Sequence, residues 1–302
     1  MGEIIHKPHL GIFDRNLCIL DSQEINSEFS PYLEDLCNFA SNSIVRCQIS
    51  LTDSEGTPVS LIYLYYHVLQ VVDGIQVLCT RACFTAAISL LRSLLEAILS
   101  IEYIIEDDFE SRSAAWLVSH YIERLHYYES FQSSEGATSE FEHLRMKDKF
   151  HKNTEFTVPD TETLAEIIKK YRDILTKPKF ADVATQFKTG KKNKKWYSLN
   201  KGPINLEQLA GRLNRPLEYK ELYRKYSAIS HAQDASRMME SDENEIYFVQ
   251  IRSPKPADEV LSLTSALFLF ATKLFFEKLR PEEDIAKLLT KIILTHRKRH
   301  KN

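Results

Sequence analysis

One stretch of the chain, residues 81–106 (RACFTAAISLLRSLLEAILSIEYIIE), constrains the fold more than any other part of the sequence. Its apolar residues cover nearly the whole circumference of a helix, so a helix here has to lie in the centre of a packed core. The segments 57–78 and 257–279 are also apolar at helical spacing. Only 8 glycines and 10 prolines occur in 302 residues, which disfavours turn-rich β folds. The sequence therefore predicts an all-α protein, a single helical-bundle domain of about eight helices.

Composition divides this chain into a helical body and less regular ends. We expect an N-terminal arm over residues 1–26, the helical domain over 27–295 and a basic tail over 296–302. Residues 132–203 are polar, basic and turn-rich apart from a helix expected at 161–175, and they predict a flexible insertion on the rim of the bundle. A short β-segment is expected at 245–252.

Charge and cysteine usage narrow the class of protein. A net charge of −3 leaves nucleic-acid binding to local basic patches. The five cysteines are odd in number and form no C-x-x-C pair, so we expect neither a disulfide framework nor a zinc site. The amino terminus lacks a signal-peptide pattern, and the most apolar runs, 59–72 and 260–272, fall short of the roughly 18–20 uninterrupted apolar residues of a membrane span. We therefore predict a cytoplasmic protein with no membrane partner.

Known catalytic and metal-binding motifs are mostly missing. Glu123 and His126 form one half of the carboxylate–histidine signature of di-iron bundles, and a complete site needs a second such motif and two further glutamates. The glycine-rich nucleotide motifs, the G-x-S-x-G elbow and H-E-x-x-H are absent. We therefore expect neither a metal nor a cofactor.

The segment 219–231 (YKELYRKYSAISH) carries the strongest candidate for catalysis, the pair Arg224 and His231. On a continuous helix they would share one face, about 10 Å apart along the axis. His231 falls where a helix is expected to end, and a helix C-terminus favours the protonated imidazole. The pair could cleave RNA without a metal, with His231 moving a proton and Arg224 stabilising the phosphate charge. The alternative is a structural pair that satisfies local carboxylates and carbonyls.

Further polar residues are expected beside this pair. The second shell would comprise Arg92, Glu96, Tyr223, Ser227 and Ser230. Arg92 and Glu96 are one turn apart on a mostly apolar helix, and a structural bridge between helices is favoured over a wall of the site.

A basic segment with aromatic residues suggests contact with RNA. Lys191, Lys192, Lys194 and Lys195 precede Trp196, and lysines for phosphates beside aromatic rings for bases suit single-stranded RNA. The alternative, at least as well supported, is a solvated loop whose Trp196 tucks into the core.

These motifs resemble a known family. The chain is similar to an uncharacterised bacterial helical family catalogued as domain of unknown function 5677. The similarity is carried by RSLLEAILSIEYI (residues 92–104), Trp196, the Leu-Ala-Gly of 209–211 and the Tyr, Ser and His positions of 219–231. More distantly, a helical bundle with an Arg before a terminal His resembles the HEPN superfamily. That resemblance implies metal-independent endoribonucleases that act as dimers in toxin–antitoxin and antiphage systems. The chain departs from the HEPN pattern at Lys225, where a small polar residue is usual, and in its long spacing.

The first hypothesis is therefore a HEPN-like endoribonuclease effector of bacterial antiphage defence or growth arrest, acting on RNA and paired with an antitoxin or defence-system partner protein. The alternative is a non-catalytic helical subunit that binds a partner or regulates a defence complex. A weaker third reading is a sensor of nucleotides or other small molecules. We also expect a homodimer, because the helices at 57–78 and 257–279 carry more apolar surface than one chain buries.

Overall fold

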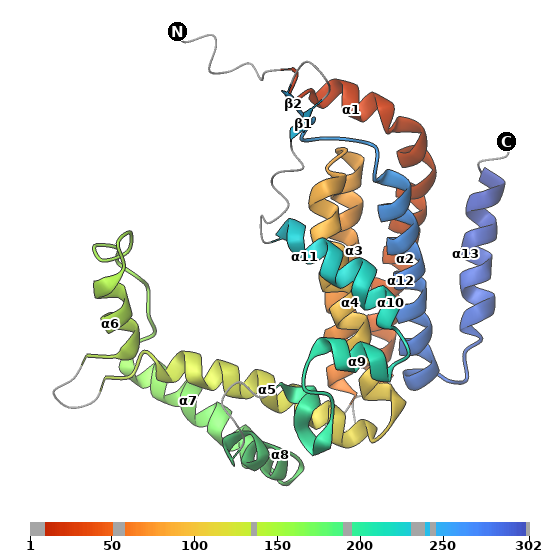
Figure 1. Ribbon diagram of the computed structural model, residues 1–302. Coiled ribbons are helices and arrows are strands. Elements are labelled where there is room, and N and C mark those ends of the chain that lie inside the picture. Colours follow the sequence, from red (N-terminus) through yellow and green to blue (C-terminus); the bar gives the residue numbers. More distant parts are fainter. Residues whose placement is uncertain are drawn as a thin grey trace. The chain divides into compact units, whose positions relative to one another are not determined.

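The computed structural model describes residues 10–50, 58–133, 138–189, 195–230, 239–241 and 246–299 (Figure 1). These residues are almost entirely helical, which confirms the predicted all-α fold. The chain forms two compact units: the first joins Met1–Asp107 to Leu206–Asn302, and the second is Asp108–Asn205. The segment 132–203 that we expected to be inserted lies wholly inside the second unit.

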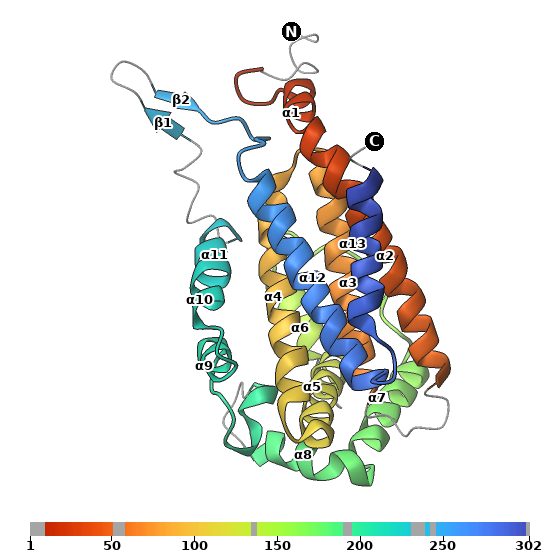
Figure 2. The ribbon, with the colours of Figure 1, turned by 90° about the vertical axis from the view of Figure 1, so that its right-hand side faces the viewer.

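Long helices that pack side by side make up the first unit. Its helices are α1 (Arg15–Asp21), α2 (Gln23–Ser50), α3 (Val59–Thr80), α4 (Phe84–Glu106), α9 (Leu206–Arg212), α10 (Pro216–Glu218), the π-helix η2 (Tyr219–Arg224), α11 (Lys225–Ser230), α12 (Ala257–Leu279) and α13 (Ile285–Arg299). The helix α4 packs against both α3 and α12, as expected for the most apolar segment (Figure 2). Two short antiparallel strands, β1 (Met239–Ser241) and β2 (Ile246–Phe248), pair with each other; β2 lies in the β-segment expected at 245–252, and β1 was not expected.

Aromatic and aliphatic side chains fill the core of this bundle. Leu91, Leu95 and Ile98 of α4 have no exposed surface. Between α3 and α12, the ring of Tyr65 stacks on Phe275 with centroids 4.1 Å apart. The Tyr65 hydroxyl lies 2.8 Å from the Thr272 hydroxyl, so its polar atom is satisfied inside the core.

Three of these helices are long and apolar enough to cross a membrane by length and composition: α3, α4 and α12. The sequence analysis counted only uninterrupted apolar runs and therefore did not identify these three helices as candidate spans. The most apolar window of each helix is 39%, 56% and 56% buried inside the protein, in that order. The cytoplasmic location stays a prediction.

A sharp reversal separates α3 from α4. We expected a helix to run through residues 79–106, but α3 continues to Thr80 and α4 begins at Phe84. Ala82 takes the left-handed conformation with φ of 54°, and the N–H of Cys83 bonds to the Leu78 carbonyl at 2.9 Å. This return of the chain closes the last turn of α3 and starts α4 beside it.

The N-terminal arm is shorter than the 26 residues expected. The helix α1 begins at Arg15, and the segment before it is tied to residues 250–252. The N–H of Ile251 bonds to the Ile12 carbonyl at 3.0 Å, and the Cys18 thiol donates to the Arg252 carbonyl at 2.6 Å. These long-range bonds hold the first described residues on the body of the first unit.

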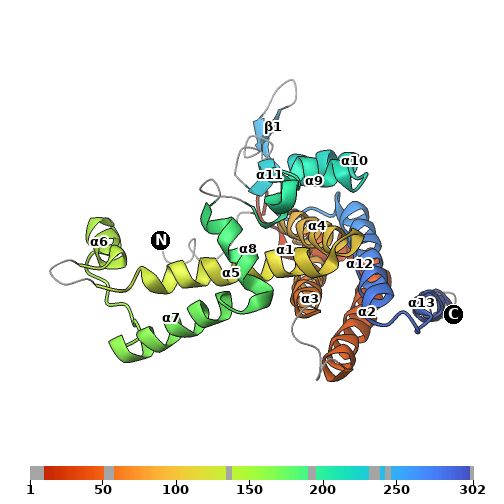
Figure 3. The ribbon, with the colours of Figure 1, turned by 90° about the horizontal axis from the view of Figure 1, so that it is seen from below.

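The second unit is also helical. It contains α5 (Phe109–Glu129), α6 (Glu140–Lys147), α7 (Thr161–Leu175), α8 (Pro178–Thr189) and the 3₁₀-helix η1 (Trp196–Lys201). Both α7 and α8 pack along α5 (Figure 3). The sequence analysis expected a loop where α8 lies. The helix forms because Pro178 suits a first helical turn and Phe180, Val183 and Ala184 share one buried face.

Candidate functional site

The candidate site lies on one helix, residues 216–230, that packs along α4 in the first unit (Figure 2). Pro216 opens it at a position where a missing N–H costs nothing. The next turn, η2, is a π-helix, a rare geometry often found at functional sites. Within that turn the rings of Tyr219 and Tyr223 stack with centroids 5.1 Å apart.

Arg92 of α4 holds this π-turn in place. It donates a hydrogen bond of 2.6 Å to the Tyr223 hydroxyl, and its Cζ lies 4.3 Å from the centre of the same ring. Its Nε is 3.6 Å from a Glu96 carboxylate oxygen. Partial burial raises the pKa of the Tyr223 phenol, so the hydroxyl stays protonated at neutral pH. We call Arg92, Glu96, Tyr219 and Tyr223 the arginine–tyrosine cluster; the sequence analysis had placed Arg92, Glu96 and Tyr223 together.

A second anchor, which the sequence analysis missed, lies further along α4. The Nε of Arg215 is 2.7 Å from a Glu102 carboxylate oxygen, and its Nη1 donates to Glu218 at 2.5 Å. Its guanidinium also covers the ring of Phe270 at 4.1 Å. Burial raises the pKa of the Glu102 carboxyl, and the opposing charge of Arg215 only limits the rise.

Arg212 continues the same row of contacts. Its Nε lies 3.0 Å from a Glu106 carboxylate oxygen, and its Cζ is 5.3 Å from the Tyr103 ring centre. The signal for both anchors was present in the sequence, since Glu102 and Glu106 interrupt an otherwise apolar helix.

The C-terminal half of the helix is anchored on α12. Tyr226 is only 2% exposed, and its hydroxyl donates to the Glu259 carboxylate at 2.6 Å. The ammonium of Lys225 lies 3.6 Å from the same carboxylate. This contact gives Lys225, the departure from the HEPN pattern, a structural role.

Arg224 differs from the three arginines just described. Its side chain is exposed, and its guanidinium makes no hydrogen bond or ion pair with any residue that the structure describes. Its positive charge acts on the neighbouring Tyr219, whose phenol pKa is nevertheless raised, mainly by burial. A solvent-facing guanidinium next to a phenol can accept an anion without first breaking an internal bond.

Of the remaining predicted residues, the second-shell serines are described and the catalytic histidine is not. Ser227 is half-buried, and Ser230 is the last residue of α11. His231 lies outside the described residues, so its convergence with Arg224 stays a prediction.

The predicted RNA-binding segment is described only at its end. Lys191, Lys192 and Lys194 lie outside the described residues, and Lys195 is exposed. Trp196 packs against the apolar core of the second unit. This partly buried position agrees with the alternative in which Trp196 tucks into the core, and the contact with RNA stays a prediction.

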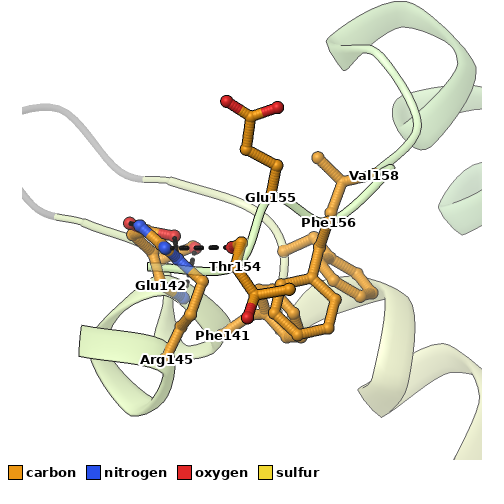
Figure 4. Close-up of a pocket in the computed structure, with 9 residues that line it drawn as sticks. Phe141, Glu142, Arg145, Thr154, Glu155, Phe156 and Val158 are labelled. Carbon is orange, nitrogen blue, oxygen red and sulfur yellow. Dashed lines mark hydrogen bonds and ion pairs between the residues drawn. The ribbon is translucent and has the colours of Figure 1, made fainter. Parts of the chain in front are cut away.

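A hollow of about 380 Å³ lies in the second unit, beside α6 (Figure 4). Phe131, Phe141 and Phe156 line it, with successive ring centroids 4.6 and 5.4 Å apart. Arg145 is paired with Glu142 and also donates to a backbone carbonyl, as the dashed line to Thr154 shows. These bonds hold the Arg145 guanidinium at the wall of the hollow, which is lined by aromatic rings and by polar residues such as Glu155.

No metal centre is present among the described residues, where no three His, Cys, Asp or Glu side chains gather. Glu123 and His126, the half motif of the sequence analysis, are both exposed on α5.

A model of one protein family matches residues 59–246, more than half of the chain. The matched part contains α3, α4, the second unit and the whole helix 216–230, and thus every residue of the arginine–tyrosine cluster. No match to the chain is found among curated proteins or among solved structures.

Proposed function

The chain belongs to the family whose model it matches, described as a family of unknown function (DUF5677), and we propose that it is a metal-independent endoribonuclease. The family description carries no reaction. The proposal therefore rests on the residues of the helix 216–230.

The observation that carries the proposal is the contrast among four arginines. Arg92, Arg212 and Arg215 are each paired with a carboxylate and an aromatic ring, which fixes the helix on α4. Arg224 on the same helix is exposed and forms no such pair with a described residue. A planar guanidinium held on an anchored helix suits bidentate contact with a phosphodiester.

The proposed reaction joins Arg224 to His231. His231 takes the proton of a ribose 2′-hydroxyl, whose oxygen attacks the adjacent phosphorus. The bond from phosphorus to the 5′-oxygen breaks, that oxygen takes a proton from water, and the resulting hydroxide takes back the proton held by His231. The products are a 2′,3′-cyclic phosphate and a 5′-hydroxyl end. Arg224 stabilises the negative charge that builds up on the phosphate oxygens.

The proposed setting follows from the HEPN resemblance: antiphage defence or toxin-type growth arrest in the cytoplasm of a bacterium, with an antitoxin or defence-system partner. We also propose a homodimer. Tyr63, Tyr66 and Val77 expose about half of their surface along one side of α3, which supports it. Among the described large apolar residues, none on α12 is exposed to that degree, so α3 alone supplies this apolar face.

The test is cleavage of total RNA and of a defined single-stranded RNA by the purified full-length protein with EDTA present. Arg224→Ala and His231→Ala should each lower the rate by about 100-fold or more. Arg81→Ala, which removes another exposed guanidinium of the first unit, is the matched control and should keep the activity. Wild-type cleavage by both site variants, or no cleavage by the wild type, would contradict the proposal.

A second candidate is a non-catalytic subunit that binds a partner or regulates a complex. The ion pairs of Arg92, Arg212 and Arg215 favour it, because these arginines are engaged within the protein. In that case the polar residues only hold helices together. His231→Ala would then lower the melting temperature by several degrees, and the wild type would leave RNA intact.

A further inference from the structure

The connection between α6 and α7 in the second unit displays an aromatic side chain among lysines. Phe150 is 80% exposed, more than any other large apolar residue that the structure describes. Lys147, Lys149 and Lys152 are exposed around it, and the Lys149 ammonium lies 5.6 Å from the centre of the Phe150 ring. We call residues 147–152 (KDKFHK) the basic–aromatic loop.

Hydrogen bonds hold this loop in its conformation. One carboxylate oxygen of Asp148 accepts the backbone N–H groups of Phe150 and His151, each at 2.8 Å. These bonds also hold the pKa of the Asp148 carboxyl below its usual range. The exposure of Phe150 is therefore a property of a folded turn.

A second brace comes from the hollow described above. Arg145 donates to the carbonyls of Lys152 at 2.8 Å and Thr154 at 3.2 Å, which closes the far end of the loop (Figure 4). The ring of His151 lies 5.7 Å from that of Phe156, which lines the hollow. The loop is thus in contact with the aromatic side chains that line the hollow.

The charges of the loop are not cancelled within the protein. Asp148 is satisfied by backbone N–H groups, and Glu142 is paired with Arg145. Among the described residues, no carboxylate forms an ion pair with the ammonium groups of Lys147, Lys149 or Lys152. Three lysine charges against the single carboxylate of Asp148 therefore leave an excess of positive charge around one exposed ring.

We propose that the basic–aromatic loop binds single-stranded RNA, with a base stacked on Phe150 and the flanking phosphates on the three lysines. Stacking platforms with adjacent cations are the common solution for unpaired strands, and a base within a duplex is not open to such stacking. The choice of RNA over DNA rests on the proposed function. The loop would supply the contact that the sequence analysis assigned to residues 191–196, where Trp196 is packed against the core.

A membrane surface fits these residues less well. Insertion needs a continuous apolar face, and Phe150 is the only apolar residue in 147–152. Leu144 and Met146 are exposed on α6, but two residues apart on a helix they point to opposite sides.

The test uses a fluorescent 2′-O-methyl oligouridine, which lacks the attacking hydroxyl and cannot be cleaved. Its binding to the full-length protein is followed by anisotropy. Phe150→Ala should raise the Kd about 5- to 150-fold, the range for loss of one stacked base. The triple variant Lys147→Ala, Lys149→Ala, Lys152→Ala should also weaken binding, and it should reduce the slope of log Kd against log salt by about 2.

Lys169→Ala, Lys170→Ala is the matched control, because both lysines are exposed on α7 of the same unit. This variant should bind like the wild type, and a duplex of the same length should bind weakly and ignore Phe150→Ala. Unchanged melting temperatures would confirm that the variants fold.

Wild-type affinity in both loop variants would overturn the inference. So would loop-dependent sedimentation with phosphatidylserine–phosphatidylcholine vesicles without RNA binding. Because the probe cannot be cleaved, these results are independent of the cleavage assays with His231→Ala. The protein can thus bind RNA through the loop without cleaving it, and it can cleave RNA without binding it through the loop.

Discussion

The substitution Tyr223→Phe removes one hydroxyl from the arginine–tyrosine cluster, a hydroxyl that is hydrogen-bonded to Arg92 and also to Glu96. It removes the hydroxyl that accepts a 2.6 Å hydrogen bond from Arg92. It keeps the ring that lies 4.3 Å from the Arg92 Cζ and stacks on Tyr219. Any loss of stability therefore reports the hydroxyl and not the packing of the ring.

The magnitude follows from the geometry. A hydrogen bond to a charged donor contributes about 1.5–3 kcal/mol, and Arg92 is 21% exposed, so we expect a value near the lower end, about 1.5 kcal/mol. Arg92→Ala also removes the cation–π contact, about 0.5–1 kcal/mol. The ion pair with the half-exposed Glu96 adds about 0.3–0.5 kcal/mol. Arg92→Ala should therefore cost about 2–3 kcal/mol in total.

The assay is urea unfolding followed by circular dichroism, for the wild type, both single variants and the double variant. The cycle should give a coupling free energy of about 1–1.5 kcal/mol between Arg92 and Tyr223. Tyr66→Phe removes an exposed hydroxyl from α3 and should leave the unfolding free energy unchanged. A coupling indistinguishable from zero would refute the view that Arg92 fixes the π-turn through this bond.

Four further expectations concern the core and the loop. Tyr65→Phe should lower the unfolding free energy by about 1 kcal/mol, because Thr272 keeps its bond to a backbone carbonyl; a loss above about 3 kcal/mol would contradict this. Burial raises the pKa of the Cys37 thiol to about 12, so iodoacetamide at mild alkaline pH should label the half-exposed Cys83 first, as peptide mass spectrometry would show. Because the pKa of the Cys37 thiol is raised in the folded state, this thiol contributes its full stability below the ordinary pKa of 9.0, and that contribution is lost as the pH rises toward about 12. Cys37→Ala should therefore flatten the fall of the unfolding free energy above pH 9.0. Arg145→Met should free the basic–aromatic loop and speed its cleavage by trypsin, and an unchanged rate would show that the two carbonyl bonds do not brace it.

Periodicity and caps predicted the long helices well. The predicted bounds of α12 agree with the structure, because its apolar period is clear. The same holds for α7, where the Asp160 side chain accepts the Thr163 N–H at 2.9 Å as an N-cap. The helix α8 was missed because it is short and lies in a lysine-rich segment. Its stability comes from burying Phe180 and Val183 in the core of the second unit, which local sequence does not reveal.

The candidate site was predicted in outline only. Arg92 and Tyr223 were placed together because each interrupts the pattern of its own segment. The pairing of Arg215 with Glu102 joins residues more than 100 positions apart, so the sequence shows a carboxylate on an apolar helix but not the arginine that pairs with it. Phe150 was overlooked because one apolar residue between lysines has no periodicity, and only the fold shows that it is displayed.

The π-turn also sets the rotation of the helix 216–230 about its own axis. Before the turn, Arg215 reaches Glu102 on α4, and after it, Tyr226 reaches Glu259 on α12. Deleting a single residue from 219–224 would rotate the following helical residues by about 100° about the helix axis, relative to the residues before the deletion. The contact of Arg215 with Glu102 and the contact of Tyr226 with Glu259 could then not form at the same time. This stretch should therefore accept an exchanged side chain far more readily than a change in its length.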